Sequence, residues 1–462
     1  RVIVSRRSPR AVSLLLIRLM SLSTAPLASG QSLGETLQQC PGTITGNTAP
    51  EQVHLQMGSD HSEMVAMWAT EQRRGSAFVQ WGVTDTAENE NEGESYCYNH
   101  DMAFHMAIMQ GLEGATEYKY RVGDGNMWSE DFTFTTIDPD AEHFEWIAIA
   151  DHSVSDEALA VSDAIIADGN AQVVTISGDI SYANGEQSVW DEWFNVQAPS
   201  MQSVPWVTAV GNHEEEEGYG FAAYEHRFDA NSVAEGEPFW YGRNLPGISL
   251  IVMSTEHDYS MSSAQFSALD ADLAAANSAE ARAQRPFIVV IGHKPMYSSN
   301  AYHGSEVELR DALEELYVEH GVDLVIAGHD HFYERTWPVA NETAMDRGVD
   351  DGTRFGRGIA PIHIVAGVAG RAAYEELVEP QPDWSAHREN NTYGWMRLVY
   401  DGDSRELDFT YHRIDGTIGD HFTISEKSVN NGDDEGGFLG IPGFGTLLPI
   451  LAMFGAAVRR LR

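Results

Sequence analysis

Five apolar runs in this chain of 462 residues each stop at a side chain that can bind a metal ion. They are FEWIAIA before Asp151, VVTISG before Asp179, VPWVTAVG before Asn212 and His213, FIVVIG before His293, and VDLVIAG before His329, Asp330 and His331. In open α/β folds, sites form in the crevice outside the carboxyl ends of the strands. We therefore expect these side chains to meet in one place.

The residue types in this set indicate which ions they would hold. Carboxylate, amide oxygen and imidazole ligands suit divalent or trivalent transition metals, and not a zinc site built from thiolates. The set is large enough for two ions, which in hydrolytic sites lie ~3.5–4 Å apart and bind both the attacking and the leaving oxygen. Each residue alone has a structural alternative, such as a helix cap for Asp179, a strand-ending turn for Asn212 or a packing role for Tyr182. In combination they favour a metal site.

The motifs and their order resemble the purple acid phosphatase family of calcineurin-like, binuclear metallophosphoesterases. The motifs are Asp151 after the first run, GDISY at 178–182, GNHE at 211–214, VIGH at 290–293 and GHDH at 328–331. Their surroundings match as well, in WDEWF, PWVTAVGNHE, GHKPMY and AGHDHFYERT. Short motifs are informative when they stand in order and in context. The resemblance extends over about residues 48–425.

The resemblance implies a centre of Fe(III) and a second, divalent ion, which would be Zn, Mn or Fe. The Fe(III) ligands would be Asp151, Asp179, Tyr182 and His331, and the ligands of the divalent ion would be Asp179, Asn212, His293 and His329. Asp179 would bridge both ions. The superfamily usually has a histidine two positions after the first aspartate, where this chain has Ser153, so Tyr182 would replace it. A phenolate beside carboxylates is a hard donor set, which favours Fe(III).

Two histidines that would not bind metal are candidate catalytic residues. By resemblance, His213 contacts the phosphate oxygens or protonates the leaving alkoxide, and His303 matches a family position near the substrate. The pKa of a histidine lies near neutrality, so a small shift readies the imidazole to donate a proton. The alternative for His303 is a solvated loop histidine.

The chemistry implied is that of an acid phosphatase, which hydrolyses small-molecule phosphate monoesters with a hydroxide activated by two cations. The alternative within the hydrolases is a phosphodiesterase or nucleotidase on the same scaffold. An alternative from another class is a non-catalytic cell-surface binding protein. The intact set of ligands disfavours that last alternative.

Residues 138–425 carry the patterns needed to position such a site. Continuous apolar runs alternate with helical stretches such as DEALAVSDAIIAD (156–168) and SEVELRDALEELYVEHG (305–321), and strand-like runs return in a C-terminal subregion, 355–425. This alternation is typical of buried parallel strands with covering helices. We expect an α/β catalytic domain, which the resemblance specifies as a four-layer α/β/β/α sandwich of the metallophosphoesterase type.

Residues 48–137, which follow an N-terminal segment at 31–47, alternate apolar and polar side chains. The short runs are VHLQM, MVAMWAT, AFVQWGV, AFHMAIM, EYKYRVG and DFTFTT, with Gly, Asn and Asp between them. This spacing indicates antiparallel strands. We expect an all-β, fibronectin type III-like sandwich before the catalytic domain, with Tyr120 and Val122 on one face of a strand.

The charge count excludes one large class of partners. Seventy Asp and Glu residues face 28 Lys and Arg residues, a formal net charge of −42, and only three residues are lysine. Nucleic-acid binding through a basic face needs clustered Lys and Arg, so we expect no nucleic-acid partner. An acidic surface with few lysines stays soluble when salt screens repulsion, which favours a halophilic, salty habitat over an ordinary one.

Acidic residues outside the ligand set are interpreted as structural. The runs ENENEGE (88–94) and EEEE (214–217) are predicted to be solvated acidic loops. Glu334 and Arg335 are adjacent and are predicted to pair with each other.

Both ends of the chain carry apolar segments that indicate export. Residues 1–30 have a basic front, an apolar middle and small residues at the end, as in a secretory signal peptide. An acidic linker at 426–437 precedes an apolar tail at 438–462, which ends in a basic cluster and is long enough to cross a bilayer. The Pro-Gly-Phe of this tail resembles the sorting signals cut by archaeosortases, after which a lipid anchor replaces the tail. The alternative is a plain membrane anchor.

Either tail places the globular part outside the cell, at the surface or secreted. The two cysteines, Cys40 and Cys97, fit an extracellular location because they could close one disulfide. Two free thiols are the alternative.

Overall fold

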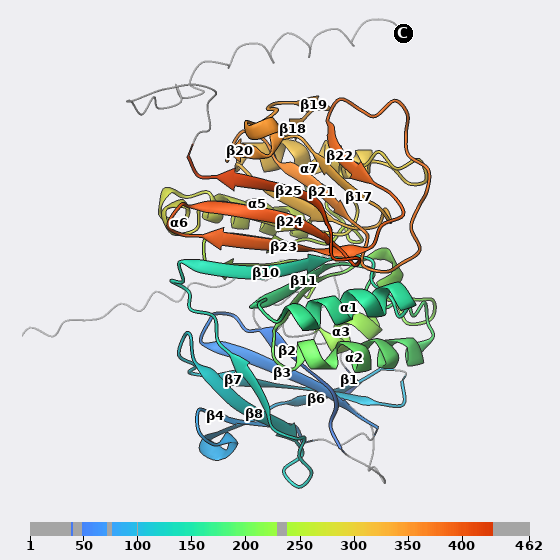
Figure 1. Cartoon of the computed structure of the whole chain (residues 1–462). Coiled ribbons are helices and arrows are strands. Elements are labelled where there is room, and N and C mark those ends of the chain that lie inside the picture. Colours follow the sequence, from blue (N-terminus) through green and yellow to red (C-terminus); the bar gives the residue numbers. More distant parts are fainter. Residues whose placement is uncertain (1–37, 40–48, 72–75, 99, 229–237, 428–462) are drawn as a thin grey trace, which may run out of the picture.

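The computed structural model describes residues 38–39, 49–71, 76–98, 100–228 and 238–427 (Figure 1). An all-β part lies at one end of the molecule, and an α/β part follows it in the chain. The predicted signal peptide, most of the acidic linker and the apolar tail lie outside these residues. In the part of the chain that the structure describes, no helix has the length and apolar character needed to span a membrane.

Two antiparallel sheets form the all-β part, in the orders β1-β6-β7-β3-β2 and β5-β4-β8-β9. The first holds β1 (Gln38–Gln39), β2 (Glu51–Met57), β3 (Glu63–Thr70), β6 (Glu94–Cys97) and β7 (Ala103–Gln110). The second holds β4 (Phe78–Gly82), β5 (Asn89–Glu92), β8 (Glu117–Gly123) and β9 (Phe132–Thr135). All six predicted runs are strands. Trp68 from one sheet and Tyr120 and Val122 from the other meet in the core between them.

The prediction of a solvated loop at 88–94 is wrong for the backbone. Asn89–Glu92 is strand β5, which pairs antiparallel with β4 at the edge of its sheet. The side chains of Glu90 and Glu92 are exposed. Because β5 buries little, no apolar periodicity marks it, and acidic side chains on an edge strand discourage pairing with another chain.

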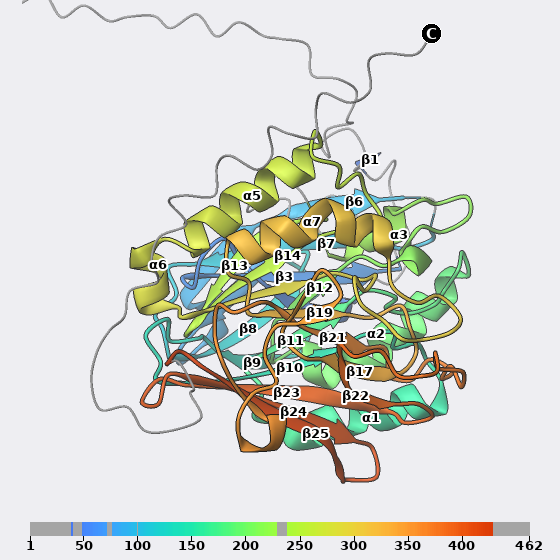
Figure 2. The same cartoon turned by 90° about the horizontal axis from the view of Figure 1, so that it is seen from above.

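Two stacked sheets form the centre of the α/β part (Figures 1 and 2). The first, in the order β12-β11-β10-β23-β24-β25-β20, holds β10 (His143–Ile149), β11 (Val173–Ser177), β12 (Trp206–Ala209), β20 (Arg354–Gly356), β23 (Gly394–Asp401), β24 (Glu406–Arg413) and β25 (Ile418–Ser425). The second, in the order β13-β14-β15-β16-β21-β17-β22, holds β13 (Tyr241–Leu245), β14 (Ile248–Val252), β15 (Phe287–Ile291), β16 (Leu324–Ala327), β17 (Tyr333–Thr336), β21 (Ile362–Ala366) and β22 (Ser385–Glu389). A short hairpin pairs β18 (Val339–Ala340) with β19 (Thr343–Ala344).

Helices cover the outer face of each sheet (Figure 2). On the side of the first sheet lie α1 (Asp156–Asp168), α2 (Gln187–Met201) and α3 (Ala222–Arg227), and on the side of the second lie α5 (Ala264–Ala276), α6 (Ala279–Gln284) and α7 (Val307–Glu319). Single 3-10 turns occur at η2 (Thr86–Glu88), η3 (Asn212–Glu214) and η4 (Asp350–Gly352). The predicted helix at 156–168 is α1. It begins after Ser155, whose side chain accepts from the Ala158 N–H, and ends at Gly169 in the left-handed region.

Alternate residues of the buried strands face opposite layers. Trp146 of β10 lies in a central core between the two sheets, whereas its neighbour Ile147 packs under the helices. In β15, Val289 joins the central core and Val290 packs under α5 and α7. Strands buried on both faces need the continuous apolar runs seen in the sequence. The described residues therefore confirm the predicted α/β/β/α layers.

The C-terminal subregion completes both sheets. Strand β23 pairs antiparallel with β10 in the first sheet, and β21 pairs parallel with β16 in the second. Residues after 355 therefore belong to the same two layers that carry the predicted metal ligands.

The predicted pair of Glu334 and Arg335 is wrong. The two residues are consecutive in β17, and consecutive side chains of a strand point to opposite faces. Arg335 Nε donates to Asp420 Oδ2 at 2.6 Å, and Glu334 Oε1 accepts from Ser299 Oγ at 2.6 Å.

Cys97 is disulfide-bonded. The chain has one other cysteine, Cys40, which lies outside the described residues. The sequence left open whether the two cysteines are free thiols or form a disulfide. The bonded state of Cys97 favours the disulfide.

Candidate metal centre

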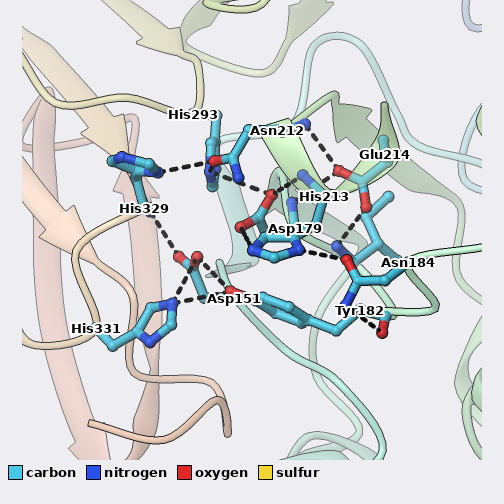
Figure 3. A network of polar contacts seen from close by, with 12 residues as sticks. Asp151, Asp179, Tyr182, Asn184, Asn212, His213, Glu214, His293, His329 and His331 are labelled. Carbon is cyan, nitrogen blue, oxygen red and sulfur yellow. Dashed lines mark hydrogen bonds and ion pairs between the residues drawn. The ribbon is translucent and has the colours of Figure 1, made fainter. Parts of the chain in front are cut away.

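Each predicted strand end carries a candidate ligand shortly after it. Asp151, Asp179 and Asn212 follow β10, β11 and β12 of the first sheet, while His293 and His329 follow β15 and β16 of the second. The strands within each of these sets are parallel, so their carboxyl ends lie at one edge of the sheet. Figure 3 shows the side chains converging, as predicted from the sequence.

Asp151, Tyr182 and His331 form one group of contacts, which we call the phenol group. The Tyr182 hydroxyl donates to Asp151 Oδ1 at 2.9 Å and lies 2.9 Å from His331 Nε2. The other nitrogen of His331, Nδ1, donates to the carbonyl oxygen of Ala372 at 2.8 Å. That contact orients the ring so that Nε2 faces the phenol and the carboxylate.

Asp179, Asn212, His293 and His329 form a second group, which we call the imidazole group (Figure 3). Asn212 Oδ1 lies 3.1 Å from His293 Nε2 and 2.9 Å from His329 Nδ1. One ligand atom each from Asp179, His293 and His329 lies within 4.8 Å of the others. The Asp179 carboxylate also lies close enough to Tyr182 for its charge to raise the pKa of that phenol, so it faces both groups.

The backbone at these groups is strained. φ is positive at four of the residues, with values of 56° at Asp151, 52° at Asp179, 56° at Tyr182 and 71° at His329. Residues other than glycine seldom occupy this region, and such strain clusters at functional sites. Two glycines make room for the carboxylates, because a Cβ on Gly211 would lie 2.3 Å from Asp179 Oδ1 and one on Gly328 would lie 2.3 Å from Asp151 Oδ2.

The charges of the imidazole group fit a cation. Burial lowers the pKa of His329 to about 2, so its imidazole is neutral and has a free lone pair. For His293, burial lowers the pKa, but the neighbouring Asp179 carboxylate outweighs burial and raises it to about 10. A metal ion would take the place of the proton on His293.

His213 lies beside both groups. Its backbone N–H donates to Asp179 Oδ1 at 2.9 Å, and its ring nitrogen Nδ1 lies 2.5 Å from Asn184 Oδ1. Because the amide oxygen accepts, Nδ1 carries the proton of this bond and Nε2 is left for another partner. The ring packs against Tyr182, with 4.4 Å between ring centroids, and burial lowers the pKa of His213.

His303, the second predicted catalytic histidine, is an exposed residue next to the imidazole group. Its ring lies 4.2 Å from that of His329 between centroids, and its Nε2 is 3.3 Å from the hydroxyl of Tyr374. The structure thus brings all nine predicted site residues into one neighbourhood, and the role of each stays a prediction.

The prediction of a solvated loop at 214–217 holds for Glu215 and Glu217, which are exposed, and is wrong for Glu214 and Glu216, which are buried. Glu214 Oε2 accepts from the backbone N–H of Asp179 at 2.9 Å and of Gly211 at 2.8 Å, and Oε1 accepts from that of Ile180 at 2.8 Å. Glu214 therefore ties the loop after β11 to the loop after β12. The sequence signal for this role is its position directly after Asn212 and His213.

Sequence analysis also missed two residues that follow β21. The Arg371 guanidinium lies 4.4 Å from the centroid of the Tyr182 ring, and the Tyr374 ring stacks on His331 with 4.3 Å between centroids. No motif marks this segment, so only the fold reveals that it reaches the phenol group.

Stacked sheets with candidate metal ligands at their converging strand ends are the arrangement of a metallophosphoesterase. Residues 143–333 match the family described as calcineurin-like phosphoesterase. The flanking regions match two further families, with residues 50–136 matching the purple acid phosphatase N-terminal domain and residues 360–421 matching the iron/zinc purple acid phosphatase-like protein C.

Several curated proteins are similar along most of their length. Acid phosphatase type 7 of Danio rerio is 30% identical over 388 residues, which cover 76% of this chain and 85% of that protein. Purple acid phosphatase of Glycine max is 31% identical over 399 residues, covering 80% and 83% of the two chains. Fe(3+)-Zn(2+) purple acid phosphatase 12 of Arabidopsis thaliana is 29% identical over 373 residues, covering 74% and 77%.

A solved purple acid phosphatase, PPD1 from yellow lupin (Lupinus luteus) seeds, has the same fold. It aligns with 82% of this chain and 74% of its own, with a TM-score of 0.71 and 22% sequence identity. Together with the family matches, these similarities place the chain in the purple acid phosphatase family, and it is a metal-dependent phosphatase.

Proposed function

We propose that this chain hydrolyses phosphate monoesters with a centre of Fe(III) and a divalent ion, which is Zn, Mn or Fe. One observation carries the proposal. The Tyr182 hydroxyl lies 2.9 Å from both Asp151 Oδ1 and His331 Nε2, and Asp179 of the imidazole group lies close enough to raise the pKa of this phenol. Phenol and carboxylates form a hard donor set that suits Fe(III), and the amide and imidazoles suit a divalent ion. The Arabidopsis thaliana relative named for Fe(3+) and Zn(2+) supports the same pair.

The proposed ligands divide along the two groups. The phenol group would hold Fe(III), Asn212, His293 and His329 would hold the divalent ion, and Asp179 would bind both. Burial and the charges of Asp151 and Asp179 raise the pKa of Tyr182 well above its usual value. Tyr182 therefore becomes a phenolate only when a strongly charged cation lies at its oxygen.

When bound, the two cations supply a hydroxide at mildly acidic pH and neutralise charge on the phosphoryl oxygens. The side chains of this protein then serve the leaving group. Asn184 accepts from His213 Nδ1 and so holds the ring with Nε2 open to the ester. In its imidazolium form, His213 donates its Nε2–H to a phosphate oxygen or gives that proton to the leaving alkoxide, and the exposed His303 is the second proton donor.

The visible absorption spectrum of the metal-loaded protein tests the iron assignment. Tyrosinate bound to Fe(III) gives a charge-transfer band, so Tyr182→Phe should abolish the colour. Tyr374→Phe is the matched control, because Tyr374 stacks on His331 outside both groups and its loss should leave the band in place. A colourless protein with two zinc or two manganese ions would refute the iron and leave the hydrolase.

Substitution of the shared carboxylate tests the site itself. Asp179→Ala should lower the metal content and reduce turnover of p-nitrophenyl phosphate by about 10³-fold or more. Turnover that survives this substitution would mean that the site is elsewhere. Faster turnover of bis-(p-nitrophenyl) phosphate than of the monoester would favour the phosphodiesterase alternative.

We also propose that the protein acts outside the cell, secreted or held at the surface by its C-terminal tail or a lipid that replaces it. The signal pattern at 1–30, the apolar tail and the disulfide-bonded Cys97 support export, because disulfides persist in oxidising compartments. Fractionation of cells that express the full chain tests this location. Activity confined to the cytosol would contradict it.

A further inference from the structure

Arg371 lies over the ring of a proposed metal ligand. Its guanidinium carbon is 4.4 Å from the centroid of the Tyr182 ring, which is within the range of a cation–π contact. Among the residues that the structure describes, no carboxylate forms an ion pair with Arg371. Arg335, by contrast, pairs with the carboxylate of Asp420. The Tyr182 ring is therefore the partner that the structure gives to the charge of Arg371.

The backbone around Arg371 is fixed beside the phenol group. The Arg371 N–H donates to the carbonyl oxygen of Asp151 at 3.0 Å, and the carbonyl oxygen of Gly370 accepts from Ser155 Oγ at 2.6 Å. A Cβ on Gly370 would lie 2.4 Å from Ala158 Cα, so the glycine lets this segment lie close to α1. The base of the Arg371 side chain is thus held at the loop that carries Asp151.

The oxygen of Tyr182 faces negative charge, whereas the ring of Tyr182 faces positive charge. The hydroxyl donates to Asp151 Oδ1, and burial together with the charges of Asp151 and Asp179 raises the pKa of this phenol well above its usual value. The two carboxylates therefore oppose a negative charge on Tyr182. The Arg371 guanidinium over the ring favours that charge, because a cation attracts a negatively charged ring more strongly than a neutral one.

We infer that Arg371 tunes how much electron density Tyr182 donates to the proposed Fe(III), an inference that rests on the proposed function. The positive charge over the ring holds electron density on the phenolate, so less of it reaches the metal ion. The ion then keeps more of its positive charge, which is the property that a hydrolytic centre uses. Arg371 therefore acts through Tyr182 and does not need to touch the substrate.

The charge-transfer band of the iron-loaded protein reports this donation directly. Its transition moves electron density from the Tyr182 ring to Fe(III), so a positive charge over the ring raises the energy of the transition. Arg371→Gln should therefore shift the band to longer wavelength, by on the order of 10 nm for the loss of a cation–π contact at an exposed site. Arg371→Lys keeps the charge but loses the flat guanidinium, so its band should lie between the other two.

Arg347→Gln is the matched control for the loss of a cation over an aromatic ring. The guanidinium carbon of Arg347 lies 5.1 Å from the centroid of the Trp337 ring, and Trp337 is not a proposed ligand. This substitution should leave the band where it is. Because the Arg371 side chain is exposed, Arg371→Gln removes no core packing, so a shift of its band would not reflect a disturbed core.

Inhibition by inorganic phosphate, measured on the same variants, separates this role from a direct contact with the substrate. A larger inhibition constant in Arg371→Gln with an unmoved band would overturn the inference and assign Arg371 to the phosphoryl oxygens. A band that moves as expected would support the inference, whatever the inhibition constant does. A metal-loaded protein without the band would refute both the Fe(III) assignment and this inference, whereas a band that Arg371→Gln leaves in place would refute the inference alone.

Discussion

Two acidic runs of this chain look alike in the sequence and have opposite places in the structure. In ENENEGE at 88–94, the glutamates of edge strand β5 are exposed. In EEEE at 214–217, Glu214 and Glu216 are buried, and Glu214 contacts the loop of the proposed ligand Asp179. The backbone of β5 pairs with that of β4, and the side chains of Glu90 and Glu92 remain exposed to solvent. Glu214 supplies the acceptors that three buried N–H groups would otherwise lack.

The pKa values of Glu88 in the first run and Glu214 in the second move in opposite directions. The pKa of Glu88 is lowered to about 2, because the Thr84 side chain and nearby backbone N–H groups donate to its carboxylate. The pKa of Glu214 is raised to about 8, because burial and the Asp179 charge oppose its ionised form. The pKa of a glutamate in an acidic run therefore depends on the donors that hydrogen-bond to it and on its burial, and not on the composition of the run.

The largest effect in this comparison is expected for Glu214→Ala. Three buried N–H groups lose their acceptor, so the free energy of unfolding should fall by about 3 kcal/mol or more. The same bonds hold the loops of Asp179 and Asn212, so phosphatase activity should fall by about 10²-fold. Urea unfolding and steady-state assays measure both. The exposed Glu217→Ala is the control and should change stability by less than about 0.5 kcal/mol.

Glu216→Ala should have a smaller effect that is confined to stability. Glu216 accepts from Trp190 Nε1 at 2.9 Å and from Gln187 Nε2 at 2.6 Å, both in α2, and touches no proposed ligand. Loss of the carboxylate should lower the free energy of unfolding by about 2 kcal/mol while kcat/KM stays within about threefold. A loss of activity as large as that of Glu214→Ala would show that the whole run, and not Glu214 alone, supports the metal centre.

The pH dependence of stability separates the exposed run from the buried one. The pKa of Glu88 is lower in the folded chain than its ordinary value of 4.5, so its stabilising contribution is present above pH 4.5 and is lost as the pH falls toward 2. Glu88→Gln should therefore lower Tm at pH 6, and the difference from the unsubstituted protein should vanish near pH 2. A difference that grows in acid would contradict this assignment.

The smallest effect is expected for Glu92→Gln in β5. This exposed side chain adds to an already large negative charge, so its neutralisation should change stability by less than about 0.5 kcal/mol. Any stabilisation at low salt should disappear at about 1 M salt, where the Debye length is about 3 Å. Urea midpoints at both salt concentrations measure the effect. Destabilisation like that of Glu216→Ala would remove the distinction between the two runs.

Much of the fold was predictable because its buried strands carry strong patterns. The runs that become β10, β11, β12, β15 and β16 are apolar on both faces, and each ends close to its ligand, so the position of Asp151 or His293 follows from the run before it. Strand β5 was not predictable in this way, because pairing with β4 needs only backbone groups and leaves no apolar signature.

The residues that sequence analysis misjudged have partners that are remote in the chain. Arg335 pairs with Asp420 across 85 positions, and Glu214 bonds to the N–H of Asp179 across 35. Local patterns carry no information on such contacts. The alternation of a strand does show that Glu334 and Arg335 face opposite sides, so that error was avoidable once β17 was recognised as a strand.

The two sheets contribute jointly to the proposed metal centre, and Asp151 and His329 meet although they stand 178 positions apart in the chain. Each ion of the proposed centre would bind ligands from both sheets and would stay bound only while the two halves of the α/β part remain docked, so it would act as a reversible clasp. A tenfold fall in free ion concentration would then weaken that clasp by about 1.4 kcal/mol for each ion. With the proposed centre, the thermal stability of the protein would therefore depend on the concentration of free metal ions around it.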